Sequence, residues 1–410
     1  MLSSVNDQAV GAVGTANTYI GIFIIMFSVI SSGMVAVMTQ NIGAGRPGVA
    51  YQARQLGLTF NAVLGIIVSL ILTFGAGAIL AGVGVADALM QPARTYLQIV
   101  GGFCILNALI PICSSYLRAF GFSKEPLYAS IIGNVINFCL NAFFLFVLHK
   151  GVAGVATATV ISRIINLVIV VLLGAVLVKA KQHPERESNR AVMGQIIRIG
   201  LPSACETAIY NVSMTLVIRF LNQMDAQGLN VTARSYTMQI TNFSYCVGAA
   251  LAQANAIMTG WHIGAKEYDA CDRGTKKAAV IGVIVAVILE TVFTLCSGWI
   301  MQLFSKDPQM VSLVGKLLAI DIVLEIGRVT NLVYGQALKT SGDAVFPVVM
   351  GVCFMILCSV GGTYLFGIRL GLLAVGAYIG MAGDECVRAI GMYLRWKSGK
   401  WKEKGLVKSR

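Results

Sequence analysis

Two stretches of this sequence repeat each other at a fixed spacing of 221 residues. The motifs Ile42-Gly43-Ala44 and Leu117-Arg118 recur as Ile263-Gly264-Ala265 and Leu338-Lys339. Single matches at the same spacing are Val10 with Val231, Ala12 with Ala233, Gly121 with Gly342 and Pro126 with Pro347; near the end the spacing becomes 220, with Gly151 matching Gly371 and Val155 matching Val375. We therefore interpret the chain as one unit duplicated, an organisation typical of secondary transporters.

Composition places this duplication in a membrane. The chain is 57% hydrophobic and only 12% charged, whereas soluble domains carry about 25% charged residues. Apolar runs of about 20 residues, long enough to span a bilayer as helices, recur along the whole chain. These runs predict an all-α integral membrane protein with eleven spans, at 10–38, 52–82, 93–117, 124–148, 152–178, 195–221, 229–259, 275–303, 310–337, 344–367 and 371–394.

The net charge of +13 is distributed unevenly between alternate loops. One set of loops, together with the tail after Leu394, carries most of the lysines and arginines. The opposite loops carry only Arg94, Lys150, Arg219, Lys306 and Arg369. This asymmetry is the positive-inside signal, and it predicts a cytoplasmic linker and C-terminus in a bacterial plasma membrane rather than a nucleic-acid-binding surface.

The two copies differ by one helix, because the segment at 195–221 has no counterpart 221 residues earlier. We expect a further helix to precede Met1, so that each copy has six helices and the two are related by an axis along the membrane normal. The predicted domains are a five-helix N-terminal half-bundle at 1–180, a linker at 181–194, a six-helix C-terminal half-bundle at 195–396 and a basic tail at 397–410.

Several short motifs occur in a characteristic order on this topology. They are Gln40-Asn41-Ile42-Gly43-Ala44-Gly45, Arg118-Ala119-x-Gly121, the set Asn134, Asn137 and Asn141, Gly200-Leu201-Pro202, and Ala337-Leu338-Lys339-x-x-Gly342-Asp343. With these motifs the chain resembles the bacterial multidrug and toxic compound extrusion (MATE) transporters, from the family's second helix to its twelfth. The resemblance implies a central cavity between two halves and export of organic cations or other amphipathic compounds, driven by inward flow of H⁺ or Na⁺.

Charged residues inside the spans are candidate functional groups, because each costs at least ~2.5–3.5 kcal/mol to insert. Asp321, Glu325 and Arg328 are spaced to lie on one face of the helix at 310–337. One arginine cannot neutralise two carboxylates, so one acid is predicted to bind a coupling cation. The alternative is a structural ion pair that ties this helix to a neighbour.

Six further charged residues in the spans are candidates. The set Asp384, Glu385 and Arg388 lies on one helix and is interpreted as a gating or helix-pairing group. Glu290 is either a coupling site or a cross-helix partner, and Arg163 is an unpaired cation that could balance an acid across the cleft. Glu206 is either a cation site or an acid stabilised by the positive end of a helix dipole.

The segment at 229–259 is unusually polar for a span, so much of it is expected to face protein or water. It supplies most of the predicted cavity wall, which consists of Gln239, Asn242, Tyr245, Gln253 and Asn255 together with Tyr210 of the preceding helix.

The sequence contains no phosphate-binding loop, His-Glu-x-x-His or Gly-x-Ser-x-Gly motif, so we predict neither an enzyme nor a metal site. No cofactor is expected beyond H⁺ or Na⁺. The leading interpretation is a monomeric cation-coupled exporter of cationic amphipathic compounds. The alternatives are a flippase for lipid-linked saccharides, which should show an excess of arginines, and a truncated non-transporting paralogue.

Overall fold

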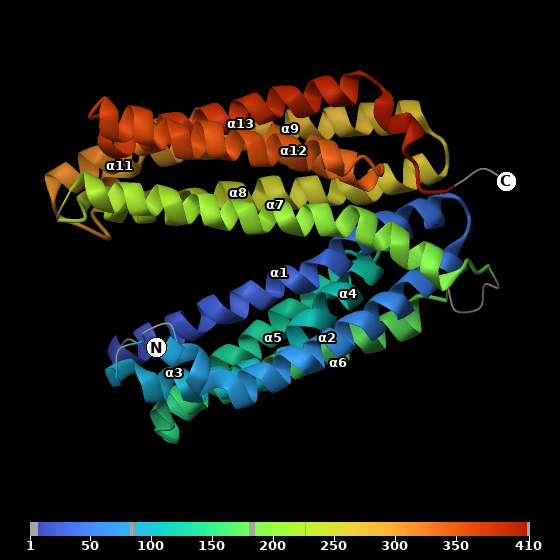
Figure 1. Ribbon diagram of the computed structural model, residues 1–410, viewed down its shortest axis with the longest axis horizontal. Coiled ribbons are helices and arrows are strands. Elements are labelled where there is room, and N and C mark those ends of the chain that lie inside the picture. Colours follow the sequence, from blue (N-terminus) through green and yellow to red (C-terminus); the bar gives the residue numbers. More distant parts are fainter. Residues whose placement is uncertain (1–6, 83–84, 86, 180–184, 226, 408–410) are drawn as a thin grey trace. The chain divides into compact units, whose positions relative to one another are not determined.

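The computed structural model of the protein describes residues 7–82, 85, 87–179, 185–225 and 227–407, and within these ranges every regular element is a helix (Figure 1). The first half contains α1 (Asp7–Gly43), α2 (Pro47–Gly82), α3 (Asp87–Gly102), α4 (Ile105–Ala119), α5 (Lys124–Ala142), the π-helix η2 (Phe143–Val147) and α6 (Gly151–Leu177). The second contains α7 (Asn189–Met224), α8 (Leu229–Gly264), α9 (Tyr268–Leu295), α10 (Ser297–Met301), α11 (Pro308–Thr340), α12 (Val345–Phe354), η4 (Met355–Val360), η5 (Thr363–Arg369), α13 (Leu373–Lys397) and the short 3₁₀ turn η6 (Lys400–Glu403).

Each of the eleven predicted segments coincides with one helix or with consecutive helices. Six of those in the described ranges are long and apolar enough to cross a membrane, and a seventh span is formed if α3 and α4 count as one. The helices α7, α8, α11 and α13 are equally long but carry more polar and charged residues. Three of them, α7, α11 and α13, contribute most of the charged groups described below, and α9 adds Glu290.

The chain divides into two compact units, Met1–Leu201 and Pro202–Arg410, with the division inside α7. In the first unit, α1 packs on α2, α3 and α4, and α6 packs on α3, α4 and α5. In the second unit, α11 is central and contacts α8, α9 and α13. Each unit has its own apolar core, so each buries its helices independently of the other.

The duplication is visible in the backbone turns of the two units. Gly45 and Lys266, 221 residues apart, both have positive φ angles, of 71° and 62°, and Gly121 and Gly342 have φ angles of 89° and 97°. The predicted spacing of 220 near the end of each copy is wrong. There the equivalent hydrogen bonds, such as Lys150 N–H to Phe144 O and Leu372 N–H to Phe366 O, are 222 residues apart. The sequence match was misleading because Gly151 and Gly371 occupy different positions of equivalent turns.

The predicted span at 93–117 consists of two helices, because α3 and α4 meet at a bend of 43°. Gly101 and Gly102 precede the bend, and glycine pairs favour kinks in helices. At the bend the Ile105 N–H donates to the Ser69 hydroxyl of α2 instead of continuing the helical pattern. The equivalent helix α11 has Ile322 and Val323 in place of the two glycines and continues without a break.

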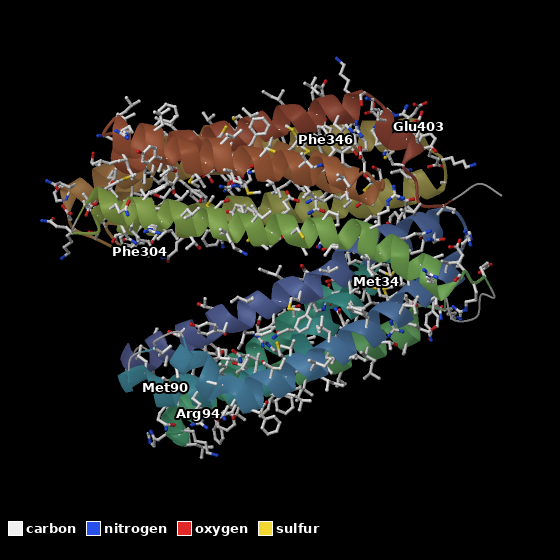
Figure 2. All side chains as sticks on the ribbon, in the orientation of Figure 1. Met34, Met90, Arg94, Phe304, Phe346 and Glu403 are labelled. Carbon is white, nitrogen blue, oxygen red and sulfur yellow. The ribbon has the colours of Figure 1, made fainter. Side chains whose placement is uncertain are left out.

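Polar segments at the basic end of each unit pack on its helices. In the linker, Glu187 pairs with Arg46 at 2.6 Å, while positions 180–184 lie outside the described residues. In the tail, Trp401 stacks on Trp396 with ring centroids 4.1 Å apart. Figure 2 marks this end of the second unit with Glu403 and with Phe346, over which the Arg395 guanidinium lies at 5.0 Å. Positions 408–410 lie outside the described residues.

The first turns of α7 cross α1 at two glycines, which leads to a stability prediction. A β-carbon added at Gly200 would lie 1.7 Å from the Val29 carbonyl oxygen, and one at Gly33 would lie 1.9 Å from the Ile196 carbonyl oxygen. Because both obstacles are backbone atoms, Gly200→Ala must push the helices apart. We expect it to lower the free energy of unfolding by about 3 kcal/mol, at the upper end of overpacking effects.

Unfolding in mixed detergent micelles would measure this effect. Gly194→Ala on the same helix is the matched control, because an added β-carbon there meets no atom within 4 Å. It should be neutral or stabilise by about 0.5–1 kcal/mol through the ordinary helix preference of alanine. Equal stability of the two variants would contradict the close packing of α1 and α7.

Candidate functional site

The predicted charged face of α11 lies buried at the centre of the second unit. Asp321 is 2% exposed and Glu325 is fully buried. Arg328, one turn further on, forms an ion pair with Glu325. The second oxygen of each carboxylate, Oδ2 of Asp321 and Oε2 of Glu325, has no hydrogen-bond partner among the described residues. The helix therefore brings together two buried acids and one cation, with carboxylate oxygens left unsatisfied.

The charged set of α13 forms a network with this face. Arg388 donates to Asp384 at 2.8 and 3.0 Å and forms an ion pair with Glu385 at 2.9 Å. Arg328 of α11 reaches the same Glu385 at 3.6 Å, and Asn331 donates to it at 3.0 Å. The two arginines thus share Glu385 and connect α11 to α13. This geometry contains the helix-pairing contacts expected from sequence, while the gating role stays a prediction.

Glu290 of α9 is the most isolated acid of the group. It is fully buried, and neither of its carboxylate oxygens has a hydrogen-bond partner in the described part of the chain. It lies close enough to Asp321 and Glu325 to interact with both electrostatically, and the Ser244 hydroxyl of α8 is beside it without forming a hydrogen bond of normal geometry. Three carboxylates from two helices therefore lie near one another, next to a single arginine.

Glu206 of α7 pairs with Lys339 of α11 at 2.5 Å. The alternative that Glu206 is a helix-start acid is wrong, because α7 begins at Asn189, more than four turns earlier. Sequence reasoning missed Lys339, since it was assigned to a loop. Its correspondence with Arg118 in the repeat was the available signal, because that motif ends a helix in both copies.

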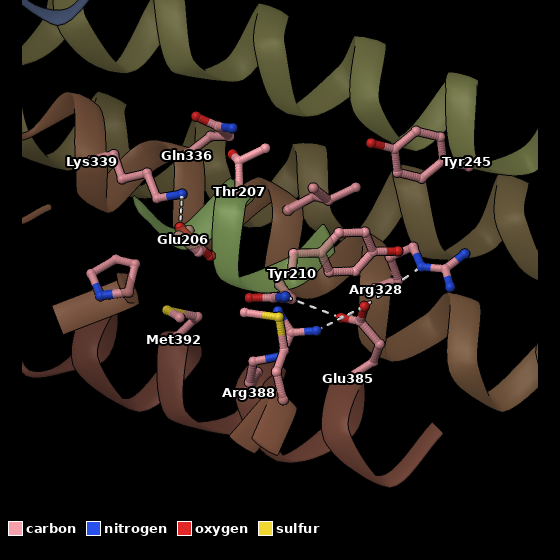
Figure 3. Close-up of a pocket in the computed structure, with 15 residues that line it drawn as sticks. Glu206, Thr207, Tyr210, Tyr245, Arg328, Gln336, Lys339, Glu385, Arg388 and Met392 are labelled. Carbon is pink, nitrogen blue, oxygen red and sulfur yellow. Dashed lines mark hydrogen bonds and ion pairs between the residues drawn. The ribbon is translucent and has the colours of Figure 1, made fainter. Parts of the chain in front are cut away.

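The second unit contains a cavity of about 270 Å³. Five of the charged side chains described above line it: Glu206, Arg328, Lys339, Glu385 and Arg388. In the view of Figure 3, the Lys339–Glu206 pair lies to the left of Tyr210 and Arg328 to its right, while Glu385 and Arg388 lie below Tyr210. The residues that line the cavity are Glu206, Thr207, Tyr210, Tyr245, Arg328, Asn331, Leu332, Gly335, Gln336, Lys339, Pro347, Met355, Glu385, Arg388 and Met392.

Two of the six predicted cavity residues, Tyr210 and Tyr245, are in this lining, and Arg328 lies over the Tyr245 ring at 5.9 Å. The other four are not in it. Gln239, Asn242 and Gln253 occupy exposed positions of α8, whereas Asn255 is buried. Their assignment to a substrate cavity stays a prediction.

Arg163 belongs to the first unit, where it lies on α6 close enough to Cys104, the residue before α4, to interact electrostatically. By the repeat spacings, Cys104 corresponds to Glu325 and Arg163 to Glu385. The first unit therefore places a thiol and an arginine where the second places two carboxylates. Pairing of Arg163 with an acid of the second unit stays a prediction.

At the positions equivalent to Asp321 and Glu290, the first unit has uncharged residues. Val100 corresponds to Asp321, and Ser69 corresponds to Glu290. The Ser69 hydroxyl accepts the hydrogen bond at the helix bend described above, so this position has a structural role in the first unit. The concentration of acids is a property of the second unit alone.

Comparison with known proteins agrees with this architecture. The family model MatE matches residues 1–143 and 202–365, one segment in each half of the chain. A relative from Bacillus subtilis, the uncharacterized transporter YisQ, is 33% identical over 99% of this chain and 90% of its own length. A probable multidrug resistance protein NorM from Thermotoga maritima is 21% identical over 98% of this chain and 87% of its own.

Solved structures share the fold. One described as the crystal structure of MATE in the straight conformation superposes with a TM-score of 0.89 at 19% identity, covering 98% of this chain and 91% of its own. Another, an outward-facing multidrug resistance MATE family transporter, gives a TM-score of 0.86 at 18% identity over 100% of this chain and 91% of its own.

Proposed function

The chain belongs to the MATE family of membrane transporters, and on this premise we propose that it exports cationic amphipathic compounds in exchange for H⁺ or Na⁺. It does so as a monomer in a bacterial plasma membrane, with its C-terminal tail in the cytoplasm. The coupling ion binds at the acids of α9 and α11, and the substrate binds in the cavity beside them.

One observation supports the coupling site above all. Glu290 and Asp321 are buried and form no ion pair among the described residues, although an arginine lies nearby. A buried charge without a partner is too costly to persist, so such carboxylates either take up a proton or hold a cation. Both protonation and cation binding neutralise the site. An inward gradient of H⁺ or of Na⁺ can drive the corresponding event.

The cavity beside the acids has the properties of an amphipathic site. Tyr210 and Tyr245 offer aromatic faces, which attract organic cations. Each of the cations in its lining, Arg328, Lys339 and Arg388, is already paired with a carboxylate. An incoming organic cation can compete for those carboxylates, and Glu325, the partner of Arg328, is itself one of the α11 acids at which the coupling ion binds. Substrate and coupling ion would then exclude one another, which is what exchange requires.

A second function has one observation in its favour. The cavity lining itself contains three cations, Arg328, Lys339 and Arg388, and only two acids, Glu206 and Glu385. A flippase for a lipid-linked saccharide, which must hold phosphate groups, would use such cations. The exporter remains the better fit, because Glu290, Asp321, Glu325 and Asp384 lie directly behind this lining and reverse the balance.

Proteoliposomes with each gradient imposed separately would test the proposal. We expect a pH gradient without Na⁺, or a Na⁺ gradient at equal pH, to drive transport of a cationic dye such as ethidium. Empty liposomes provide the background. Failure of both gradients to move the dye would contradict cation-coupled export, and transport of a fluorescent anionic lipid instead would identify the flippase.

A further inference from the structure

The first unit contains an apolar groove that the transport mechanism does not use. It has a volume of about 370 Å³ and lies between α2, α4 and α6. Its lining is Arg54, Leu58, Thr59, Ala62, Leu109, Cys113, Leu167 and Val171. Seven of these eight side chains are apolar or nearly so, and the remaining one is an arginine at one end of the series along α2.

Arg54 interacts with aromatic rings and with the Cys113 thiol, and among the described residues it has no carboxylate partner. Its planar group lies 4.7 Å from the centroid of the Tyr116 ring and 5.9 Å from that of Tyr51. No carboxylate forms an ion pair with it in the described part of the chain, and its Nε is buried without a hydrogen-bond partner. The Arg186 guanidinium also lies over the Tyr51 ring, at 5.6 Å from its centroid. The aromatic rings hold Arg54 in place, but they do not neutralise its charge.

The groove opens on a surface suited to lipid. Exposed apolar side chains flank it on α2, including Phe60 and Val63, and on α6, including Val168 and Leu172. Arg54 is seven residues after Pro47, the start of α2, which is about 10 Å along the helix axis. It therefore lies near the end of the span that carries the basic loops, at the depth where the headgroup region meets the acyl chains.

We propose that this groove binds one anionic phospholipid of the leaflet at the basic end of the helices. The phosphate of the headgroup accepts hydrogen bonds from Arg54, and one acyl chain lies along Leu58, Ala62, Leu109 and Leu167. Basic pockets between membrane helices are a general means of holding anionic lipids. The planar donor array of arginine suits a phosphate better than a lysine would.

The second unit does not repeat this site. The position equivalent to Arg54 is Thr275, whose hydroxyl lies 3.4 Å from that of Thr259. The position equivalent to Cys113 is Tyr334, whose ring packs against that of Trp396 at a tilt of 56°, with ring centroids 6.1 Å apart. Aromatic packing thus fills the place where the first unit has its groove. The lipid site is expected once per chain.

Native mass spectrometry of the purified protein would test the proposal, using delipidated protein titrated with phosphatidylglycerol or phosphatidylcholine. The unmodified chain should bind one phosphatidylglycerol at least about fivefold more tightly than phosphatidylcholine, as expected for one added charge contact. Arg54→Gln should remove this preference. Lys397→Gln is the matched control, because Lys397 is an exposed cation elsewhere at the basic end, and it should leave the preference unchanged.

A second variant addresses the groove without touching the arginine. Ala62→Phe fills the apolar part, and it should weaken binding of phosphatidylglycerol by about fivefold or more while Arg54 remains. Inorganic phosphate at millimolar concentration should not displace the lipid. Equal phosphatidylglycerol binding by the unmodified chain and both variants would overturn the proposal, as would displacement by phosphate alone.

Discussion

Glu290→Gln should abolish gradient-driven transport while leaving the protein at least as stable as before. The carboxyl group at this position is fully buried and lacks any hydrogen-bond partner in the described part of the chain. Glutamine has nearly the same shape but cannot ionise, so the substituted protein never carries the cost of a buried charge at this position. It also loses the group that binds H⁺ or Na⁺. Asp321→Asn should act in the same direction, because Asp321 likewise forms no ion pair among the described residues.

Two measurements separate the effects. Dye transport in proteoliposomes should fall to the level of empty liposomes, whereas the free energy of unfolding in detergent should stay the same or rise by about 1 kcal/mol or more. Glu403→Gln is the matched control, since Glu403 is an exposed acid of the tail. Transport at the unmodified rate by a well-folded Glu290→Gln protein would exclude Glu290 as the coupling residue, without bearing on the lipid groove of the first unit.

Arg388→Gln should cause the largest loss of stability among the charged residues of the second unit. Arg388 is 5% exposed and neutralises both Asp384 and Glu385. Its removal leaves a buried acid without its cation, which typically costs about 3–5 kcal/mol. Lys339→Gln, which separates one cation from the single acid Glu206, should cost less.

A double variant gives this prediction a second readout. Combining Arg388→Gln with Asp384→Asn removes the acid that is left without a cation, so much of the lost stability should return. Unfolding curves of the three proteins in the same detergent would show it. An Arg388→Gln protein as stable as the unmodified chain would contradict the prediction, because Glu385 keeps Arg328 at 3.6 Å but Asp384 forms no other ion pair among the described residues.

Much of the helical architecture could be predicted from the sequence, for a physical reason. A span in a bilayer must satisfy its own backbone hydrogen bonds, so a long apolar run has few options other than a helix. The repeated turns also agree with the sequence, because Gly121 and Gly342 adopt the positive φ angles that glycine favours. The bend between α3 and α4 was not predicted, because it depends on a hydroxyl of another helix, that of Ser69.

The candidate site was predictable only in part. Spacing along one helix placed Asp321, Glu325 and Arg328 on a common face, because that relation is local. The proximity of Glu290 to these acids, the pairing of Glu206 with Lys339 and the sharing of Glu385 by two arginines all join different helices. No spacing in the sequence encodes which helix faces which.

The sequence by itself determined that this chain is a duplicated bundle of membrane helices with costly charges inside its second half. Those features follow from local composition, helical periodicity and the price of burying ions. Only the tertiary structure decided which charges neutralise one another, and therefore that Glu290 and Asp321 form no ion pair within the described ranges. Neutralisation depends on distances of a few ångströms between side chains from separate helices, which are fixed when the helices pack.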